Sequence, residues 1–103
     1  MTTTSYSGAA EVIDVLSRRA ALNVVQVLTS GSVSERALVS RLSAYNSSVV
    51  SQRVEDLKRL DIVEVIPESG DLRLSARGRR LLGALEAMEA WAAEAATQAR
   101  RAR

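Results

Sequence analysis

Residues 47–65, SSVVSQRVEDLKRLDIVEV, contain a change of hydrophobic period that carries the strongest structural signal in the chain. On a helical wheel, Val50, Val54 and Leu57 share one side of residues 47–60, while polar side chains occupy the other. Residues 62–66 then alternate in a β-branched run, as strands do. The stretch therefore predicts a helix with a polar outer face that leads into a strand.

The sequence upstream predicts a second helix close to the first. Ser34 is a suitable N-cap for a short helix that carries Leu38 and Leu42 with helical spacing. Residues 43–46, SAYN, read as a tight turn, and Asn46 can cap the helix over 47–60. Two short helices joined by a turn are the outline of a helix-turn-helix.

The sequence downstream predicts a hairpin and a long final helix. Residues 67–70, PESG, have turn chemistry, and residues 71–75 alternate again around leucines. Ser75 is a suitable N-cap for a helix over residues 76 to about 99, with apolar residues at heptad-like spacing. A hairpin after a helix-turn-helix is a wing, so the expected fold is mainly α with a small β-hairpin.

Two further helices are expected before the helix-turn-helix. One begins near Gly8 and carries Leu16, and the next has Ser17 as its cap and Gly31 as its stop. The expected organisation is a disordered arm over 1–7, a winged helix-turn-helix DNA-binding domain over 8–75, and a C-terminal dimerisation helix with a basic tail over 76–103.

Composition excludes several classes of function. The 103 residues are 47% hydrophobic, carry a formal net charge of +2 and contain no cysteine or histidine. Thiolate and imidazole chemistry and Cys/His zinc sites are thereby excluded, and no nucleophile lies beside a base, so we expect neither a cofactor nor a metal nor catalysis. The apolar runs are too short for a membrane span, and the expected location is cytoplasmic.

The cations are unevenly distributed. Residues 72–103 carry seven cations and three anions, whereas residues 1–71 carry seven cations and nine anions. A basic second half favours a polyanionic partner, although a small excess of Arg is weak evidence for it.

Two segments resemble a known family. Residues 49–65 resemble the recognition helix and first wing strand of the HxlR and ArsR families, where a Ser, an Arg and spaced Leu residues recur. Residues 74–91, LSARGRRLLGALEAMEAW, resemble the HxlR pattern of Leu-Thr-x-x-Gly followed by spaced Leu residues and a Trp. The resemblance covers Glu11 to Ala92 and implies an HxlR-like winged helix-turn-helix transcriptional regulator of the ArsR/MarR superfamily.

The chain departs from that family at several positions. Residues 17–20, SRRA, stand where a Lys-Trp pair is usual, and Asp61 stands where a Gly precedes the first wing strand. Asp61 can adopt the left-handed geometry at some cost. The wing is short, and Arg73 is its only cation.

The candidate DNA contacts lie mainly on the polar face of residues 47–59. Small Ser side chains allow close approach to a groove, Gln52 can bond an adenine edge at two points, and arginines can reach phosphate or guanine. Glu55 can accept from cytosine N4 or repel nonspecific phosphate contact. A solvated helix face is the simpler alternative. The full set is Ser47, Ser48, Ser51, Gln52, Arg53, Glu55, Arg59, Arg73 and Arg77.

Several arginines outside this face have two interpretations. Arg77, Arg79 and Arg80 stand in the first turn of the last helix, where cations oppose the helix dipole, so they either contact phosphate or pair with Glu residues. Arg18 and Arg19 either contact the DNA backbone or pair with Glu11 or Asp14.

Apolar residues of the first and last helices predict a homodimer interface. The last helix is longer than so small a core can cover, and Trp91 at the margin of its stripe is typical of an interface rather than of ligand stacking. Tyr45 is expected to pack against the helix pair. The dimerisation set is Val12, Leu16, Leu81, Leu85, Met88, Trp91 and Ala95.

Two functions follow from these features. The first is a sequence-specific regulator that binds double-stranded DNA as a homodimer, with a recognition helix in the major groove. The alternative is a winged-helix module that binds a protein partner and has no DNA operator. Glu55, Asp56, the short wing and the near-neutral net charge favour the alternative.

Overall fold

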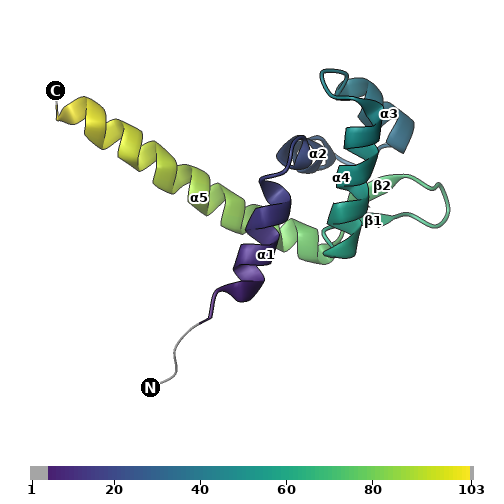
Figure 1. Ribbon diagram of the computed structural model, residues 1–103, viewed down its shortest axis with the longest axis horizontal. Helices are drawn as coiled ribbons and strands as arrows, with labels where there is room; N and C mark the ends of the chain where they lie inside the picture. The colour runs from purple at the N-terminus through teal and green to yellow at the C-terminus, as the bar shows by residue number, and fades with distance from the viewer. Residues whose placement is uncertain (1–4, 103) are drawn as a thin grey trace.

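The computed structural model describes residues 5–102 and has the predicted mainly helical architecture with one hairpin (Figure 1). Residues 1–4 of the expected disordered arm lie outside the described residues, and Ser7 already belongs to the first helix. The elements, in chain order, are α1 (Ser7–Leu16), α2 (Ala21–Leu28), α3 (Glu35–Arg41), α4 (Ser47–Arg59), β1 (Val63–Val65), β2 (Leu72–Leu74) and α5 (Ala76–Arg101).

Two of the predicted helix caps are confirmed. The Ser34 hydroxyl accepts a hydrogen bond from the backbone N–H of Ala37 at 3.1 Å, and the Ser75 hydroxyl accepts one from Gly78 at 2.9 Å. Asn46 occupies the N-cap position of α4 with extended backbone but makes no side-chain cap bond. These positions fix where α3, α4 and α5 begin.

The prediction that Ser17 caps α2 is wrong. Ser17 follows the last residue of α1, and its hydroxyl donates to the carbonyl of Asp14 at 2.7 Å. A turn then separates the two helices, closed by the bond from Ala21 N–H to the carbonyl of Arg18. The helix begins only after Ala20, which is buried and has a left-handed φ of 70°.

One hydrophobic core lies between α2, α3, α4 and the hairpin. Val50, Val54 and Leu57 point into it with no more than 1% of their surface exposed, as the wheel predicted. Leu28 and Val24 of α2 pack from the other side. The inward face of α4 is therefore buried in the core, and its outward face can contact a binding partner.

The hairpin is the predicted wing, and its register places two opposite charges across from each other. Val63 pairs with Leu74, and Glu64 pairs with Arg73. Gly70 closes the turn with a φ of 78°, a conformation that Gly adopts without steric cost. Val33 adds an isolated bridge to Leu72, so the segment before α3 is fastened to the sheet.

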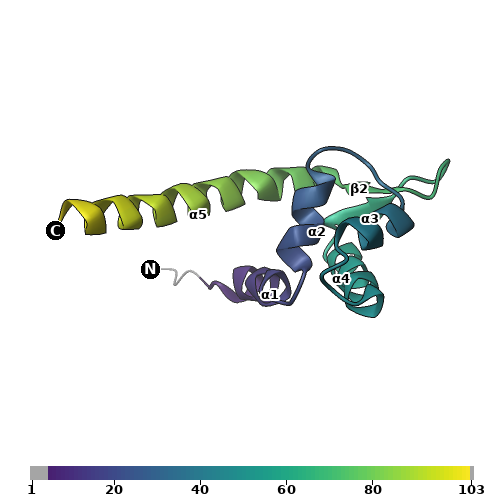
Figure 2. The ribbon, with the colours of Figure 1, turned by 90° about the horizontal axis from the view of Figure 1, so that it is seen from above.

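Helix α5 extends far beyond the core (Figures 1 and 2). Gly78 is buried against the backbone of Ile62, and Leu81, Leu82 and Leu85 are half-buried. From residue 86 onward the described residues are exposed. In the described part of the chain, no helix is both long and apolar enough to cross a bilayer.

Candidate nucleic-acid interface

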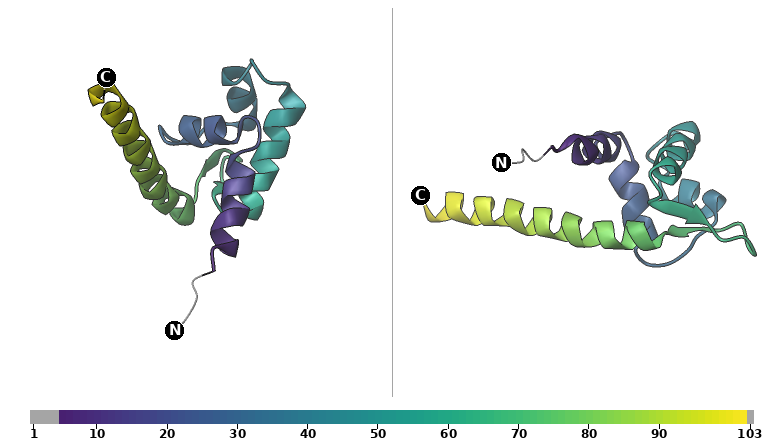
Figure 3. Two further views of the ribbon diagram at one scale, coloured as in Figure 1. Left: turned by 60° about the vertical axis from the view of Figure 1, so that its left-hand side comes forward. Right: turned by 90° about the horizontal axis from the view of Figure 1, so that it is seen from below.

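Helix α4 lies along one edge of the molecule, away from the far part of α5 (Figure 3). Its outward face presents a polar stripe. Ser48, Gln52, Glu55 and Arg59 are all exposed, and their spacing of four, three and four residues places them along one side of the helix. Ser47 is also exposed, and Ser51 is half-buried. This side faces away from the core, as the sequence predicted.

A buried carboxylate organises the centre and C-terminal half of α4. Asp56 is only 2% exposed, yet four side chains contact its two oxygens. Oδ1 accepts from Gln52 Nε2 at 3.2 Å and from Arg59 Nη2 at 2.9 Å. Oδ2 lies 3.0 Å from Arg18 Nη1 and 3.1 Å from Arg53 Nη1. We call these five residues the Asp56 network.

The network keeps Asp56 ionised despite its burial. Burial is the largest single influence and would raise the pKa of the carboxyl. The hydrogen bonds from Gln52 and Arg18, with the charges of Arg53 and Arg18, outweigh that influence and hold the pKa of Asp56 below its ordinary value. Asp56 is thus a fixed negative charge next to the exposed stripe.

The network changes the environment of three predicted DNA contacts. The Arg53 side chain is only 17% exposed and is directed at Asp56, with its Nε buried and unpaired among residues 5–102. Arg59 is 66% exposed but also paired with Asp56. Gln52 is exposed and already donates one amide hydrogen. Arg53 is therefore the least accessible of the three arginine and glutamine side chains in the network that were predicted to contact DNA.

The remaining charges near the wing differ in whether they are paired. Glu55 pairs with Lys58 at 3.2 Å, and Arg73 pairs with Glu64 across the hairpin at 2.7 Å. Arg77 and Arg80 are exposed and form no ion pair within the described range. The pairing of Arg77, Arg79 and Arg80 with Glu residues, one of their two interpretations, is therefore not seen.

The turn between α1 and α2 supplies the long-range member of the network. Arg18 reaches Asp56 from 38 positions earlier and also pairs with Asp14 at 3.0 Å, one of the two acids expected for it. Arg19 lies over the ring of Tyr45, 5.5 Å from its centroid. Tyr45 packs on the core, as predicted, and its hydroxyl donates to Asn23 Oδ1 at 3.2 Å. The turn between α1 and α2 therefore contacts both α4, through Asp56, and the connection between α3 and α4, through Tyr45.

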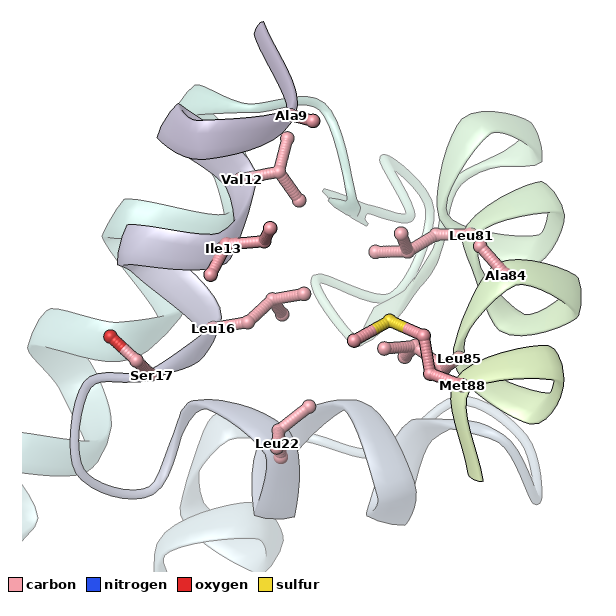
Figure 4. A pocket seen from close by; sticks show the side chains of 10 residues that line it. All are labelled: Ala9, Val12, Ile13, Leu16, Ser17, Leu22, Leu81, Ala84, Leu85 and Met88. Carbon is pink, nitrogen blue, oxygen red and sulfur yellow. The ribbon is translucent and has the colours of Figure 1, made fainter. Parts of the chain in front are cut away.

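An apolar groove of about 430 Å³ lies between α1 and α5, with α2 at its base (Figure 4). Val12 and Leu16 of α1 point across it toward Leu81, Leu85 and Met88 of α5. Five predicted dimerisation residues therefore line one surface. Trp91, 72% exposed, continues this surface along α5, and the predicted Ala95 is exposed one turn beyond it.

The described residues hold no group of three or more acidic side chains placed to bind a metal ion. The chemistry available on α4 is therefore hydrogen bonding by Ser, Gln and Arg side chains and charge interaction with an anion.

Comparisons with known proteins bear on the fold. No protein-family model matches the chain, and no curated protein matches it in sequence. A structure from Enterococcus faecalis V583 described as a transcriptional regulator of the MarR family is similar over 98% of this chain and 96% of its own, with a TM-score of 0.81 and 20% identity.

The B. subtilis transcriptional regulator YodB is also similar. Its reduced form covers 89% of this chain and 92% of its own, with a TM-score of 0.74 and 22% identity. Its quinone-bound form covers 84% and 97%, with a TM-score of 0.75 and 20% identity. At 20–22% sequence identity, the similarity to these structures establishes the fold of the chain and nothing finer. The chain therefore has the winged helix-turn-helix fold of these regulators, with α4 as the second helix of its helix-turn-helix.

Proposed function

We propose that the protein is a cytoplasmic, DNA-binding transcriptional regulator that acts as a homodimer and inserts α4 into the major groove. The observation that carries this proposal is the exposed polar stripe of α4, which occupies the recognition position of a fold shared with transcriptional regulators. Its small serines allow the helix backbone to approach base edges, and Gln52 and Arg59 have suitable donors.

The wing and the start of α5 would contact the flanking backbone. Arg77 and Arg80 are exposed and unpaired among the described residues, so their full charge is available to phosphate. Arg73 would have to exchange Glu64 for phosphate, which is feasible because both side chains are well exposed. We rank Arg77 above Arg73 as a phosphate contact for this reason.

The apolar groove and Trp91 support the homodimer. Leu85 is only half-buried, Met88 is 58% exposed and Trp91 is 72% exposed, so a contiguous apolar surface lies open on the single chain. Contiguous exposed apolar surface of this kind marks interaction sites. In a two-fold dimer the second α4 would reach the next major groove, which predicts half-sites about 10 bp apart.

A titration of labelled duplexes tests the DNA proposal. The wild-type protein is titrated by fluorescence anisotropy against the region upstream of its own gene and against a scrambled duplex, at several salt concentrations. We expect tighter binding to a specific site and an affinity that falls as salt rises. Equal binding to both duplexes, or binding that ignores salt, would contradict the proposal.

The informative variant is Ser48→Glu, because Ser48 is exposed on the stripe and lies outside the Asp56 network. A carboxylate there repels phosphate, so we expect specific affinity to fall at least roughly tenfold. Gln26→Glu, on the exposed surface of α2, makes the same change of charge and should leave binding unchanged. Arg53→Ala is less informative because it also breaks a half-buried ion pair.

Protein binding is the second candidate, and one observation favours it. Arg53, Arg59 and Arg73 are each paired with an acidic side chain, which lowers the positive potential that DNA would meet. A stoichiometric protein partner, together with no enriched site after selection from genomic DNA fragments, would establish this alternative.

A further inference from the structure

We propose that Asp56 is a specificity-determining residue, which positions Gln52 and Arg59 on the α4 stripe and limits their attraction to phosphate of arbitrary sequence. The inference rests on the proposed DNA-binding function. Asp56 is buried and would not itself touch DNA. Its proposed role is to set the ratio of specific to nonspecific affinity.

Asp56 can position the two side chains that would contact DNA without reaching the DNA itself. Asp56 Oδ1 is shared by Gln52 Nε2 at 3.2 Å and Arg59 Nη2 at 2.9 Å, and both of those side chains are exposed on the stripe. Asp56 itself is buried, and Arg18 and Arg53 hold its other oxygen. The carboxylate cannot swing outward without losing these partners, so it forms a fixed support beneath two exposed side chains.

The shared oxygen determines which atoms of Gln52 remain for a base. One amide hydrogen is committed to Asp56, which fixes the amide orientation and directs Oε1 and the second hydrogen elsewhere. A preorganised acceptor and donor favour a base that offers the matching pair, such as adenine. An amide free to rotate would discriminate less.

The same oxygen also weakens the attraction of Arg59 to phosphate. An arginine paired with a buried carboxylate must weaken that pair before it binds phosphate fully, and phosphate contacts supply most of the nonspecific affinity. At a specific site Arg59 can keep its bond to Asp56 and direct its other guanidinium hydrogens to a base edge, so this cost does not arise there. Asp56 would therefore reduce nonspecific affinity more than specific affinity.

The test compares Asp56→Asn with Glu35→Gln. Both remove one negative charge, but Glu35 lies in the first turn of α3, is exposed, and forms no ion pair among the described residues. Circular-dichroism melts first establish a temperature at which each variant is folded. Affinity for the specific and the scrambled duplex is then measured against salt for both variants and the wild type.

For Asp56→Asn we expect nonspecific affinity to rise several-fold and its salt dependence to steepen by up to about 0.9 in log–log slope, one phosphate's share. We expect the ratio of specific to nonspecific affinity to fall roughly tenfold, with the loss concentrated at the base that Gln52 reads. Glu35→Gln should change both affinities by similar factors. Equal changes for the two variants, or an equal loss at both duplexes for Asp56→Asn, would overturn the inference.

Arg59→Gln provides a second measurement that does not disturb the core, because this side chain is 66% exposed. We expect it to lower specific affinity more than nonspecific affinity, whereas Lys58→Gln lowers both equally. A nonspecific loss as large as the specific one would overturn the inference. A wild-type protein that binds no duplex would instead overturn the proposed function, and this inference with it.

Discussion

A single buried carboxylate makes the stability of this protein depend on acid. The folded protein holds the pKa of Asp56 below its ordinary value of 3.8, so the ionised form contributes stability. That contribution is complete above the ordinary value and is lost as the pH falls from there through the lower pKa of the folded state. The part of the stability that ionised Asp56 supplies should therefore be lost only in acid.

Asp56→Asn should remove this acid-dependent part. At neutral pH we expect it to lower the free energy of unfolding by roughly 1–3 kcal/mol, because three arginines lose their shared partner. Urea midpoints from about pH 7 to about pH 3 provide the measurement, and the difference from wild type should shrink toward the acid end. A difference that is constant with pH would mean that Asp56 is not the group responsible.

The spacing of residues in the sequence predicted the exposed side chains of this site but not the buried Asp56 at its centre. The wheel placed Gln52 and Arg59 outward, and they are exposed. Asp56 is outside the predicted set of contacts, although Gln52, Arg53 and Arg59 stand at helical spacing from it and indicate that the four side chains can interact. Its burial also depends on Arg18, which is 38 positions away, and no local pattern in the sequence reports that contact.

At the scale of the elements, a glycine near the start of α5 allows this helix to pack closely on the backbone of Ile62. An added Cβ at Gly78 would overlap the carbonyl oxygen of Ile62, and backbone cannot move aside as a side chain can. This close approach explains the glycine in the segment that resembles the HxlR pattern. It also fixes the angle at which α5 leaves the wing.

Gly78→Ala and Gly83→Ala should therefore have opposite effects on stability. We expect Gly78→Ala to destabilise the fold by about 3 kcal/mol or more, because α5 must separate from the backbone of Ile62, just before β1. Gly83 lies in the same helix with open space around it, so Ala there should stabilise the fold by up to about 1 kcal/mol. Thermal melts of the two variants are the measurement, and destabilisation by both would point to a packing role for Gly83 as well.

Element boundaries were predictable where a side chain makes the cap and unpredictable where the backbone does. Ser34 and Ser75 cap their helices through their hydroxyls, and both positions were predicted. Helix α2 begins after Ala20, a residue with no capping group in a left-handed conformation, so the sequence offered no local signal. Asp61 has a φ of 57°, the left-handed geometry that was expected to be open to it before the first wing strand.

At the scale of the whole molecule, Trp91 reports on association. It is the single tryptophan of the chain and is 72% exposed. If the groove and α5 form the homodimer interface, burial of the indole should shift its emission to shorter wavelength as protein concentration rises.

Leu85→Glu, which places a charge in the groove, should abolish the shift in Trp91 emission, whereas Gln26→Glu on exposed α2 surface should retain it. Sedimentation velocity gives the mass in parallel. A dimer that forms while the emission stays constant would place the interface elsewhere.

The length of α5 has a consequence for its own integrity. Beyond residue 85 the described helix has no buried side chain, and an isolated helical segment of this size is only marginally stable in water, even when rich in alanine. Its amide hydrogens should then exchange quickly in dilute protein and slowly at high concentration, while those of α4 stay protected throughout. The far part of α5 would thus complete its folding only when a second chain arrives.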